Sequence, residues 1–243
     1  MDPVAFKIFG IEIMWYAILI TLGVFLGVLV ASKLAKYNDL NPDIVVDILI
    51  FALPAAIIGA RIYYVAFEWD YYSKNLNQIV NIRSGGLAIY GGLIAAFLVG
   101  YIYSRVKKIN FLKITDIFAP AIALGQGVGR WGNFINQEAY GTATNLPWGI
   151  MIDGQKVHPT FLYESIGDII IFLLLYILCK NKKKFDGQII SLYLILYGIL
   201  RFFVEGLRTD SLYFLGFRVS QILSLILVIV GIIIYLVKTK KTK

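Results

Sequence analysis

The chain is poor in the residues that hold small or metal-dependent proteins together. It contains one cysteine, Cys179, and one histidine, His158, among its 243 residues. A lone cysteine excludes an internal disulfide, so the fold does not depend on oxidation. A lone histidine without a partner cysteine argues against a zinc site, which usually needs several such ligands. We therefore expect the protein to use no metal and no other cofactor.

Charged residues are scarce as well. They make up 16% of the chain and hydrophobic residues 59%, against about 25% and about 45–50% in soluble domains. With a mean hydropathy of +0.75, the apolar side chains cannot all be hidden in a core with a polar shell. This composition excludes a soluble globular domain, a disordered chain and a collagen-like rod. It indicates an all-α integral membrane protein that forms a single polytopic domain over residues 1–243.

Seven apolar runs are long enough to cross a bilayer, which takes ~20 mostly apolar residues per helix. They are residues 13–31, 45–66, 87–104, 117–135, 161–179, 189–204 and 219–237. Three of these runs carry no charge, and the charged residues in the other four are where a function should be sought. The longer outer connections, about residues 68–85 and 136–159, are expected to form a small extracytoplasmic head made of loops.

Lysine and arginine are distributed unevenly between the connections. They concentrate in residues 33–36, 105–113, 180–184 and 238–243, which fall on one side of the membrane if the seven spans alternate. Because positive residues favour the cytoplasm, the N-terminus is expected outside and the C-terminus in the cytoplasm. The net charge of +8 therefore reflects topology, and we expect no nucleic-acid partner.

One face of the sixth predicted span carries charges. In LYGILRFFVEGLR, the residues Tyr197, Arg201, Glu205 and Arg208 are spaced so that they share one helix face. A charge at a helix centre costs ~2.5–3.5 kcal/mol on insertion scales, so it normally faces protein or a watery cavity. Two arginines against one glutamate leave a positive charge suited to phosphate, which a guanidinium binds with two parallel hydrogen bonds. An Arg–Glu pair that only fixes helix packing is the alternative.

The fourth predicted span ends in a glycine-rich polar sequence, LGQGVGRWGNFINQEAYG. Arg130, Asn133 and Glu138 lie among its glycines. The Gly-x-Gly-x-x-Gly spacing also matches a dinucleotide-binding motif, but that motif follows a β-strand, whereas this segment ends a membrane span. We therefore interpret the glycines as sites of close helix packing or of backbone that lines a cavity.

Two further residues have both a structural and a functional interpretation. Arg61 follows Pro54 and Gly59 in its span, and it either snorkels to the lipid headgroups or binds a lipid phosphate. His158, in HPTFLYE, is either a surface residue or a participant in catalysis. Glu164 in the same motif pairs either with this histidine or with an arginine.

Together these residues predict an outward-facing, partly apolar cavity lined by arginines, asparagines, tyrosines and carboxylates. A phospholipid headgroup suits such a cavity, because its phosphate meets arginine while its tails stay in lipid. A transporter for an anionic solute is a second possibility, but no inverted repeat is visible in the sequence. A phosphatase or phosphotransferase acting on lipids is a third, but it commonly needs a metal, a histidine nucleophile or a close carboxylate pair. A scaffold would not need buried arginines in several spans.

The motifs resemble those of the prolipoprotein diacylglyceryl transferases, the bacterial enzymes that attach the first lipid to lipoproteins. The resemblance covers nearly the whole chain and is carried by MWYAILI, GARIYYV, GGLAIYGGL, GVGRWGNFINQEAYG, HPTFLYE and YGILRFFVEGLR. It implies a seven-helix fold in the bacterial cell membrane with the active site open to the outer side. The implied reaction moves the diacylglyceryl group of phosphatidylglycerol to the lipobox cysteine of a prolipoprotein signal peptide, forming a thioether and releasing glycerol phosphate.

The resemblance also implies roles for individual residues. Arg130 and Arg201 match arginines that the family requires, and we expect them to clamp the lipid phosphate while Asn133 hydrogen-bonds the headgroup. The other residues that we expect to contribute, all in matched motifs, are Tyr16, Arg61, Glu138, Gly141, Tyr197, Glu205 and Arg208.

The chain departs from the family at one position. Many members have a histidine where this chain has Tyr90, in IYGG rather than IHGG. A mechanism that uses that histidine as general base cannot be transferred here. The thiol proton is then taken by Tyr90, His158 or Glu138, or by the expelled phosphate.

The expected absence of a metal leads to a first prediction. The purified protein should keep its transfer activity in excess EDTA, because no step of the expected reaction needs a bound cation. The measurement is the rate of lipid transfer to a signal peptide before and after chelation. Complete loss of activity in EDTA, restored by adding back a divalent metal, would contradict this expectation.

Overall fold

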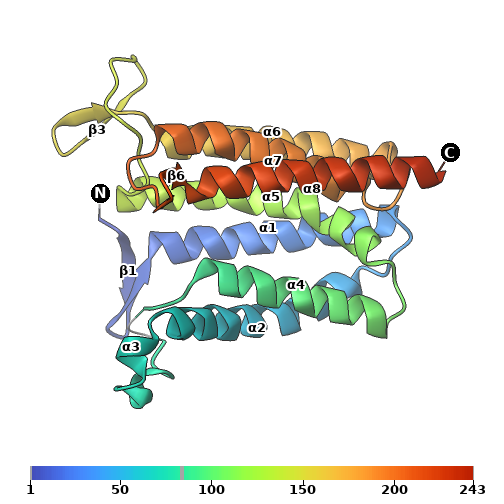
Figure 1. The fold of residues 1–243 in the computed structure, drawn as a ribbon, viewed down its shortest axis with the longest axis horizontal. Coiled ribbons are helices and arrows are strands. Elements are labelled where there is room, and N and C mark those ends of the chain that lie inside the picture. The colour runs from blue at the N-terminus through green and yellow to red at the C-terminus, as the bar shows by residue number, and fades with distance from the viewer. Residues whose placement is uncertain (1, 83–84, 243) are drawn as a thin grey trace. The chain divides into compact units, whose positions relative to one another are not determined.

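The computed structural model describes residues 2–82 and 85–242, most of which are helical. Within them, seven helices are long and apolar enough to cross a membrane, which confirms the predicted number of spans (Figure 1). Residues 1, 83–84 and 243, which include parts of the predicted outer segment and of the basic tail, lie outside the described residues. The chain divides into two compact units, Met1–Asp39 with Thr115–Lys243 and Leu40–Ile114, and each is described by itself.

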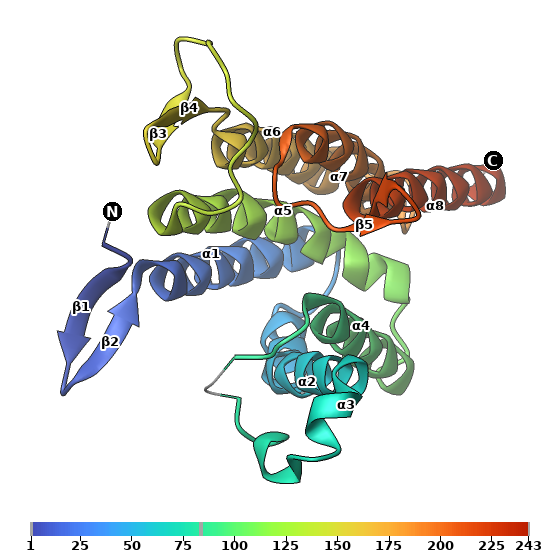
Figure 2. The same cartoon turned by 60° about the vertical axis from the view of Figure 1, so that its left-hand side comes forward.

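The larger unit contains five long helices and three short β-hairpins. The helices are α1 (Trp15–Tyr37), α5 (Phe111–Asn136, in this unit from Thr115), α6 (Thr160–Asn181), α7 (Gln188–Leu207) and α8 (Val219–Thr242). The hairpins are β1–β2 (Val4–Ile8 and Ile11–Met14), β3–β4 (Ile150–Ile152 and Gln155–Val157) and β5–β6 (Tyr213–Phe214 and Phe217–Arg218). Within this unit the hairpins and the N-terminus lie at one end of the helices and the C-terminus at the other (Figure 1). Figure 2 shows β1–β2 and β3–β4 as separate extensions of that end.

Each hairpin is closed by a two-residue turn whose second residue is glycine. The turns are Phe9–Gly10, Asp153–Gly154 and Leu215–Gly216, and φ is positive at both residues of each. Positive φ at both positions is typical of the type I′ turn, which glycine adopts without steric cost. The expectation of loops at the outer end did not include these hairpins, because strands of two to five residues are too short for a recognisable alternation.

Glycines allow the helices of this unit to approach closely. A Cβ added at Gly23 in α1 would lie 3.2 Å from the carbonyl oxygen of Gly125 in α5. A Cβ at Gly127 in α5 would lie 3.3 Å from the carbonyl oxygen of Ser165 in α6. Helices in lipid associate largely through such close van der Waals packing, which small residues permit. The glycine-rich sequence thus has the packing role that its composition suggests.

A buried carboxylate joins α5 to the start of α7, at the end of the unit away from the hairpins. Asp116 is fully buried and accepts hydrogen bonds from the backbone N–H groups of Gly187, Ile189 and Ile190, at 2.8, 3.0 and 2.9 Å. The first turn of a helix leaves such N–H groups without partners inside the helix. The carboxylate therefore caps α7 from a different helix, and its charge suits the positive end of the helix dipole.

Lys183, in the connection between α6 and α7, balances the charge of this cap. Its ammonium lies 3.0 Å from the Asp116 carboxylate and 2.9 Å from that of Asp186. Burial disfavours the charged ammonium, but the two carboxylates outweigh this effect and raise the pKa of Lys183 above its ordinary value. Lys183 consequently stays charged, and the buried Asp116 carboxylate keeps a counter-ion.

The smaller unit is built on two long helices that pack along each other. They are α2 (Asp43–Phe67) and α4 (Ile89–Val106), connected through the short helix α3 (Trp69–Tyr72) and the 3₁₀ turn η1 (Leu76–Gln78). The two helices approach most closely where Gly59 meets Gly91. An added Cβ at Gly91 would lie 2.3 Å from the Gly59 carbonyl oxygen.

We predict that Gly91→Ala destabilises the protein by about 1–3 kcal/mol, the usual cost of overpacking. The new methyl group would meet main-chain atoms that cannot move aside without separating α2 from α4. Thermal unfolding in detergent checks this, with Gly100→Ala as the control in the same helix. An added Cβ at Gly100 would have its nearest neighbour, Phe111, at 3.7 Å, so it fits. Equal melting temperatures for the two variants would contradict the close approach at Gly91.

Candidate active site

A carboxylate on α6 joins two arginines that come from the helices on either side of it. The Glu164 carboxylate lies 2.9 Å from Nε of Arg130 on α5 and 2.6 Å from Nη1 of Arg201 on α7. The Nη2 atom of Arg201 lies 2.6 Å from the carboxylate of Glu205, one turn further along α7. These four residues, which we name the arginine–carboxylate cluster, carry two positive and two negative charges.

Burial explains why these charges are paired so closely. Glu164 is 2% exposed and Glu205 is 1% exposed, so neither carboxylate is solvated by bulk water. A buried charge is tolerated only when opposite charges and hydrogen bonds replace its hydration. The sequence left two partners open for Glu164, and the structure pairs it with the arginines rather than with His158. The Arg–Glu pair that the sequence offered as an alternative is also present, between Arg201 and Glu205.

His158 is held by aromatic side chains. Its Nδ1 atom lies 3.2 Å from the hydroxyl oxygen of Tyr163, one turn into α6. The indole N–H of Trp148 donates to the same hydroxyl oxygen at 2.9 Å. Tyr163 thus holds the His158 ring through Nδ1, and which of the two groups donates depends on the tautomer of the ring.

Gly141 lies where three segments of the chain meet. Its N–H donates to the carbonyl oxygen of His158 at 2.9 Å, and it forms a β-bridge with Arg208 at the end of α7. An added Cβ would lie 2.7 Å from Cβ of His158 and 3.1 Å from the carbonyl oxygen of Leu207. A side chain at this position would therefore push His158 away from the end of α7.

Arg208 does not join the arginine–carboxylate cluster through its own side chain. Its guanidinium donates two parallel hydrogen bonds to Asp210, at 2.9 and 2.7 Å. These bonds hold the pKa of the Asp210 carboxyl below its usual range. The excess positive charge expected on this helix face is thus balanced by Glu164 and Asp210.

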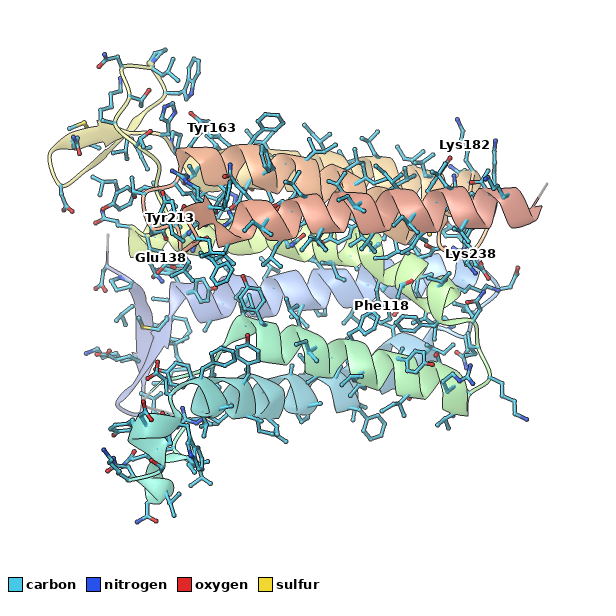
Figure 3. All side chains as sticks on the ribbon, in the orientation of Figure 1. Phe118, Glu138, Tyr163, Lys182, Tyr213 and Lys238 are labelled. Carbon is cyan, nitrogen blue, oxygen red and sulfur yellow. The ribbon has the colours of Figure 1, made fainter. Side chains whose placement is uncertain are left out.

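Asn133 and Glu138 form a second polar group at the end of α5. The amide nitrogen of Asn133 donates to the Glu138 carboxylate at 2.9 Å, and the Glu138 N–H donates to the Asn133 carbonyl oxygen at 3.0 Å. Asn136 donates to the same carboxylate at 3.4 Å. Figure 3 shows Glu138 at the hairpin end of the larger unit, together with Tyr163 and Tyr213, and Lys182 and Lys238 at the opposite end.

Two tyrosines of the predicted site, Tyr16 and Tyr197, lie on α1 and α7. Tyr16, at the start of α1, packs directly on Gly132, where an added Cβ would lie 2.3 Å from its ring. Tyr197 stacks on Tyr193 with ring centroids 5.5 Å apart, and it interacts electrostatically with Arg130 and with other charges of the cluster. Both tyrosines belong to the larger unit.

The two remaining predicted residues, Arg61 and Tyr90, belong to the smaller unit. Arg61 is 6% exposed and donates hydrogen bonds to five backbone carbonyl oxygens, of Gln78, Ile79, Asn81, Gly85 and Gly86, at 2.6–3.0 Å. Its guanidinium also lies 5.1 Å from the ring centroid of Tyr72. Arg61 thus organises the connection between α2 and α4, and its binding of lipid stays a prediction. Tyr90, 38% exposed in the first turn of α4, stays a candidate base.

The sequence reasoning left three carboxylates out of the expected site. Glu164 and Asp168 interrupt an apolar span four residues apart, which places them on one helix face, and that spacing was the available signal. Asp210 follows Arg208 by two residues and offered no such signal. Among residues 2–82 and 85–242, no three His, Cys, Asp or Glu side chains converge as metal ligands, and the independence from metal stays a prediction.

The known proteins to which this sequence is similar are transferases. The sequence profile of the prolipoprotein diacylglyceryl transferase family matches residues 3–237. A phosphatidylglycerol–prolipoprotein diacylglyceryl transferase of Finegoldia magna is 66% identical over 241 residues, covering 99% of this chain and 97% of that protein. Proteins of the same name are 57% identical over 243 residues in Clostridioides difficile and 47% identical over 254 residues in Clostridium perfringens. These two matches cover 100% of this chain, and 98% and 97% of the respective relatives.

We predict that Glu164→Gln lowers the free energy of unfolding by about 3 kcal/mol, the lower end of the cost of breaking a buried ion pair. The amide keeps the shape of the side chain but leaves Arg130 without a counter-ion, whereas Arg201 keeps Glu205. Asp210→Asn is the control, since that side chain is half exposed and its pair should contribute less than about 1 kcal/mol. Thermal unfolding of both variants in detergent measures the difference. If Asp210→Asn were as destabilising as Glu164→Gln, Glu164 would not have the central position assigned to it.

Proposed function

This chain belongs to the prolipoprotein diacylglyceryl transferase family, and we propose that it transfers the diacylglyceryl group of phosphatidylglycerol to the lipobox cysteine of prolipoproteins. The observation that carries the proposal is the arginine–carboxylate cluster, which holds two guanidinium groups inside an apolar bundle. The reaction is the first step of bacterial lipoprotein maturation.

The bonds that change set the requirements for the site. The cysteine sulfur forms a bond to the terminal glyceryl carbon as the bond between that carbon and the phosphate oxygen breaks. The products are a thioether and glycerol phosphate, and the thiol proton passes to a base. The phosphate gains one negative charge in this step, so fixed positive groups beside it stabilise the transition state more than the bound lipid.

We propose that Arg130 and Arg201 supply these positive groups. Within the described residues, no hydrogen-bond acceptor occupies the two terminal nitrogens of Arg130, whose side chain is 21% exposed. A guanidinium edge of this kind fits two phosphate oxygens at once. Glu164 holds both arginines and orients them without occupying all their donors. Asn133 lies one turn beyond Arg130 on α5, where its amide can reach the glycerol of the headgroup.

Four groups are candidates to take the thiol proton. Tyr163 holds the ring of His158 through Nδ1, and two amides hold the carboxylate of Glu138. Tyr90 replaces a histidine of the family motif. The phosphate product is itself basic enough to accept a proton, so we leave these four acceptors as alternatives.

The distribution of charge along the larger unit supports the membrane orientation that we propose. Lysines gather at the end of the helices opposite the hairpins, as Lys182 and Lys238 do in Figure 3. By the preference of basic residues for the cytoplasm, that end faces the cytoplasm and the hairpin end faces outward from the cell membrane. Phosphatidylglycerol of the outer leaflet and the signal peptide then both reach the arginine–carboxylate cluster from the lipid.

The transfer can be tested by mass spectrometry. Protein in detergent, phosphatidylglycerol and a synthetic signal peptide with a lipobox cysteine should yield a peptide heavier by one diacylglyceryl group. A Cys→Ser peptide should remain unmodified. Absence of the adduct with folded protein and supplied lipid would overturn the proposed reaction, and transport of an anionic solute into liposomes would be measured next.

We predict that Arg201→Ala lowers the transfer rate by roughly 10²–10³, as loss of one preorganised donor to a developing charge does elsewhere. Arg201→Lys should recover only part of the rate, because an ammonium keeps the charge but not the planar fork. Arg105→Ala, at the exposed end of α4, is the matched control and should keep the wild-type rate. Near-normal turnover by a folded Arg201→Ala protein would remove this residue from the phosphate clamp.

A further inference from the structure

One buried carboxylate beside the arginine–carboxylate cluster has no partner. Asp168 lies on α6, one turn beyond Glu164, and is 0% exposed. Within the described residues, neither of its carboxylate oxygens has a hydrogen-bond partner. Buried side-chain oxygens are nearly always satisfied in folded proteins, so this exception needs a physical explanation.

The groups that face Asp168 do not supply a counter-ion for it. Electrostatic interactions reach it from Arg130 on α5, from Glu164 on its own helix and from Arg201 on α7. Tyr193 and Tyr197 on α7 complete the set of titratable neighbours. Both arginines are already matched by Glu164 and Glu205, so an ionised Asp168 would be a third carboxylate against two guanidinium groups.

An unpaired charge in such surroundings is removed by protonation. A carboxylate that loses its hydration and gains no partner becomes neutral, and a neighbouring carboxylate adds repulsion in the same direction. With Asp168 neutral, the arginine–carboxylate cluster has no net charge. With Asp168 ionised, the same space carries one net negative charge beside the expected position of an anionic lipid.

We propose that Asp168 is a proton-holding positioning residue: it must be protonated for the site to bind phosphatidylglycerol, and its ionisation at alkaline pH weakens that binding. The proposal rests on the proposed function and adds a pH-dependent control of it. When Asp168 ionises, its proton leaves to water and its carboxylate competes with the lipid phosphate for Arg130 and Arg201. The transfer step itself leaves Asp168 unchanged, and no other reactant is required.

Asp168→Asn tests the proposal, because asparagine has nearly the shape of neutral aspartic acid and cannot ionise. Transfer rates would be measured from neutral to alkaline pH in detergent, with phosphatidylglycerol varied at each pH. The peptide thiol ionises equally in both assays. Dividing the variant's rate by the wild-type rate at each pH therefore removes the effect of thiol ionisation on the rate. Asp47→Asn, a carboxylate within α2 that accepts a hydrogen bond from Tyr103, is the matched control.

We expect Asp168→Asn to match the wild type within a few-fold at neutral pH. At alkaline pH, the wild-type KM for phosphatidylglycerol should rise by about tenfold per pH unit, because binding requires one proton that is lost. The KM of the variant should not change with pH. The Asp47→Asn profile should follow the wild type. Superimposable profiles for Asp168→Asn and the wild type would overturn the proposal. Inactivity or misfolding of Asp168→Asn at every pH would also overturn it, because a neutral side chain would then not suffice.

An infrared measurement separates this proposal from the proposed function. A protonated buried carboxyl group has a carbonyl stretching band that an ionised one lacks, and titration of the full-length wild type follows it without any substrate. The band should be present at neutral pH, disappear at alkaline pH, be absent from Asp168→Asn and persist in Asp47→Asn. Absence of the band at neutral pH would overturn the proposal even in an active transferase. A titrating band in a protein without transferase activity would overturn the proposed function instead.

Discussion

The hairpin end of the larger unit depends on the neutralisation of arginine in an apolar medium. A guanidinium cannot lose its charge, so each arginine placed among membrane helices must find a carboxylate, backbone carbonyl oxygens or water. Glu164 meets this requirement for Arg130 and Arg201 at once, which ties α6 to both α5 and α7. The glycine contacts between α5 and α6 bring the backbones near enough for these side chains to reach one another.

The same constraint connects folding to function in this family. The charges that a transferase needs for a phosphate are the charges that an unliganded membrane protein can least tolerate. Pairing them with Glu164 and Glu205 makes the bundle stable before lipid arrives and keeps the arginines oriented. The two carboxylates compensate the two guanidinium charges before any anionic group binds, so the four residues of the cluster carry no net charge.

The features that depend on local composition could be predicted from the sequence. The seven spans follow from hydropathy alone, and Arg130 and Arg201 were recognisable because a charge inside an apolar run is unusual. The partners of these charges could not be predicted with the same certainty. Glu164 had two candidates, and only the packing of α5, α6 and α7 selects the arginines. Arg61 illustrates the limit further, since its five carbonyl acceptors belong to a connection whose path no local pattern specifies.

The placement of the chain ends has a practical consequence for handling the protein. Helix α8 has 24 residues, which at 1.5 Å per residue is a rod of about 36 Å. Its last residue lies at the end of the larger unit opposite the hairpins (Figure 1). An affinity tag or fluorescent fusion attached after α8 therefore stands a full helix length from the arginine–carboxylate cluster. A tag attached before β1 would instead crowd the hairpin end, where we expect lipid and peptide to gather.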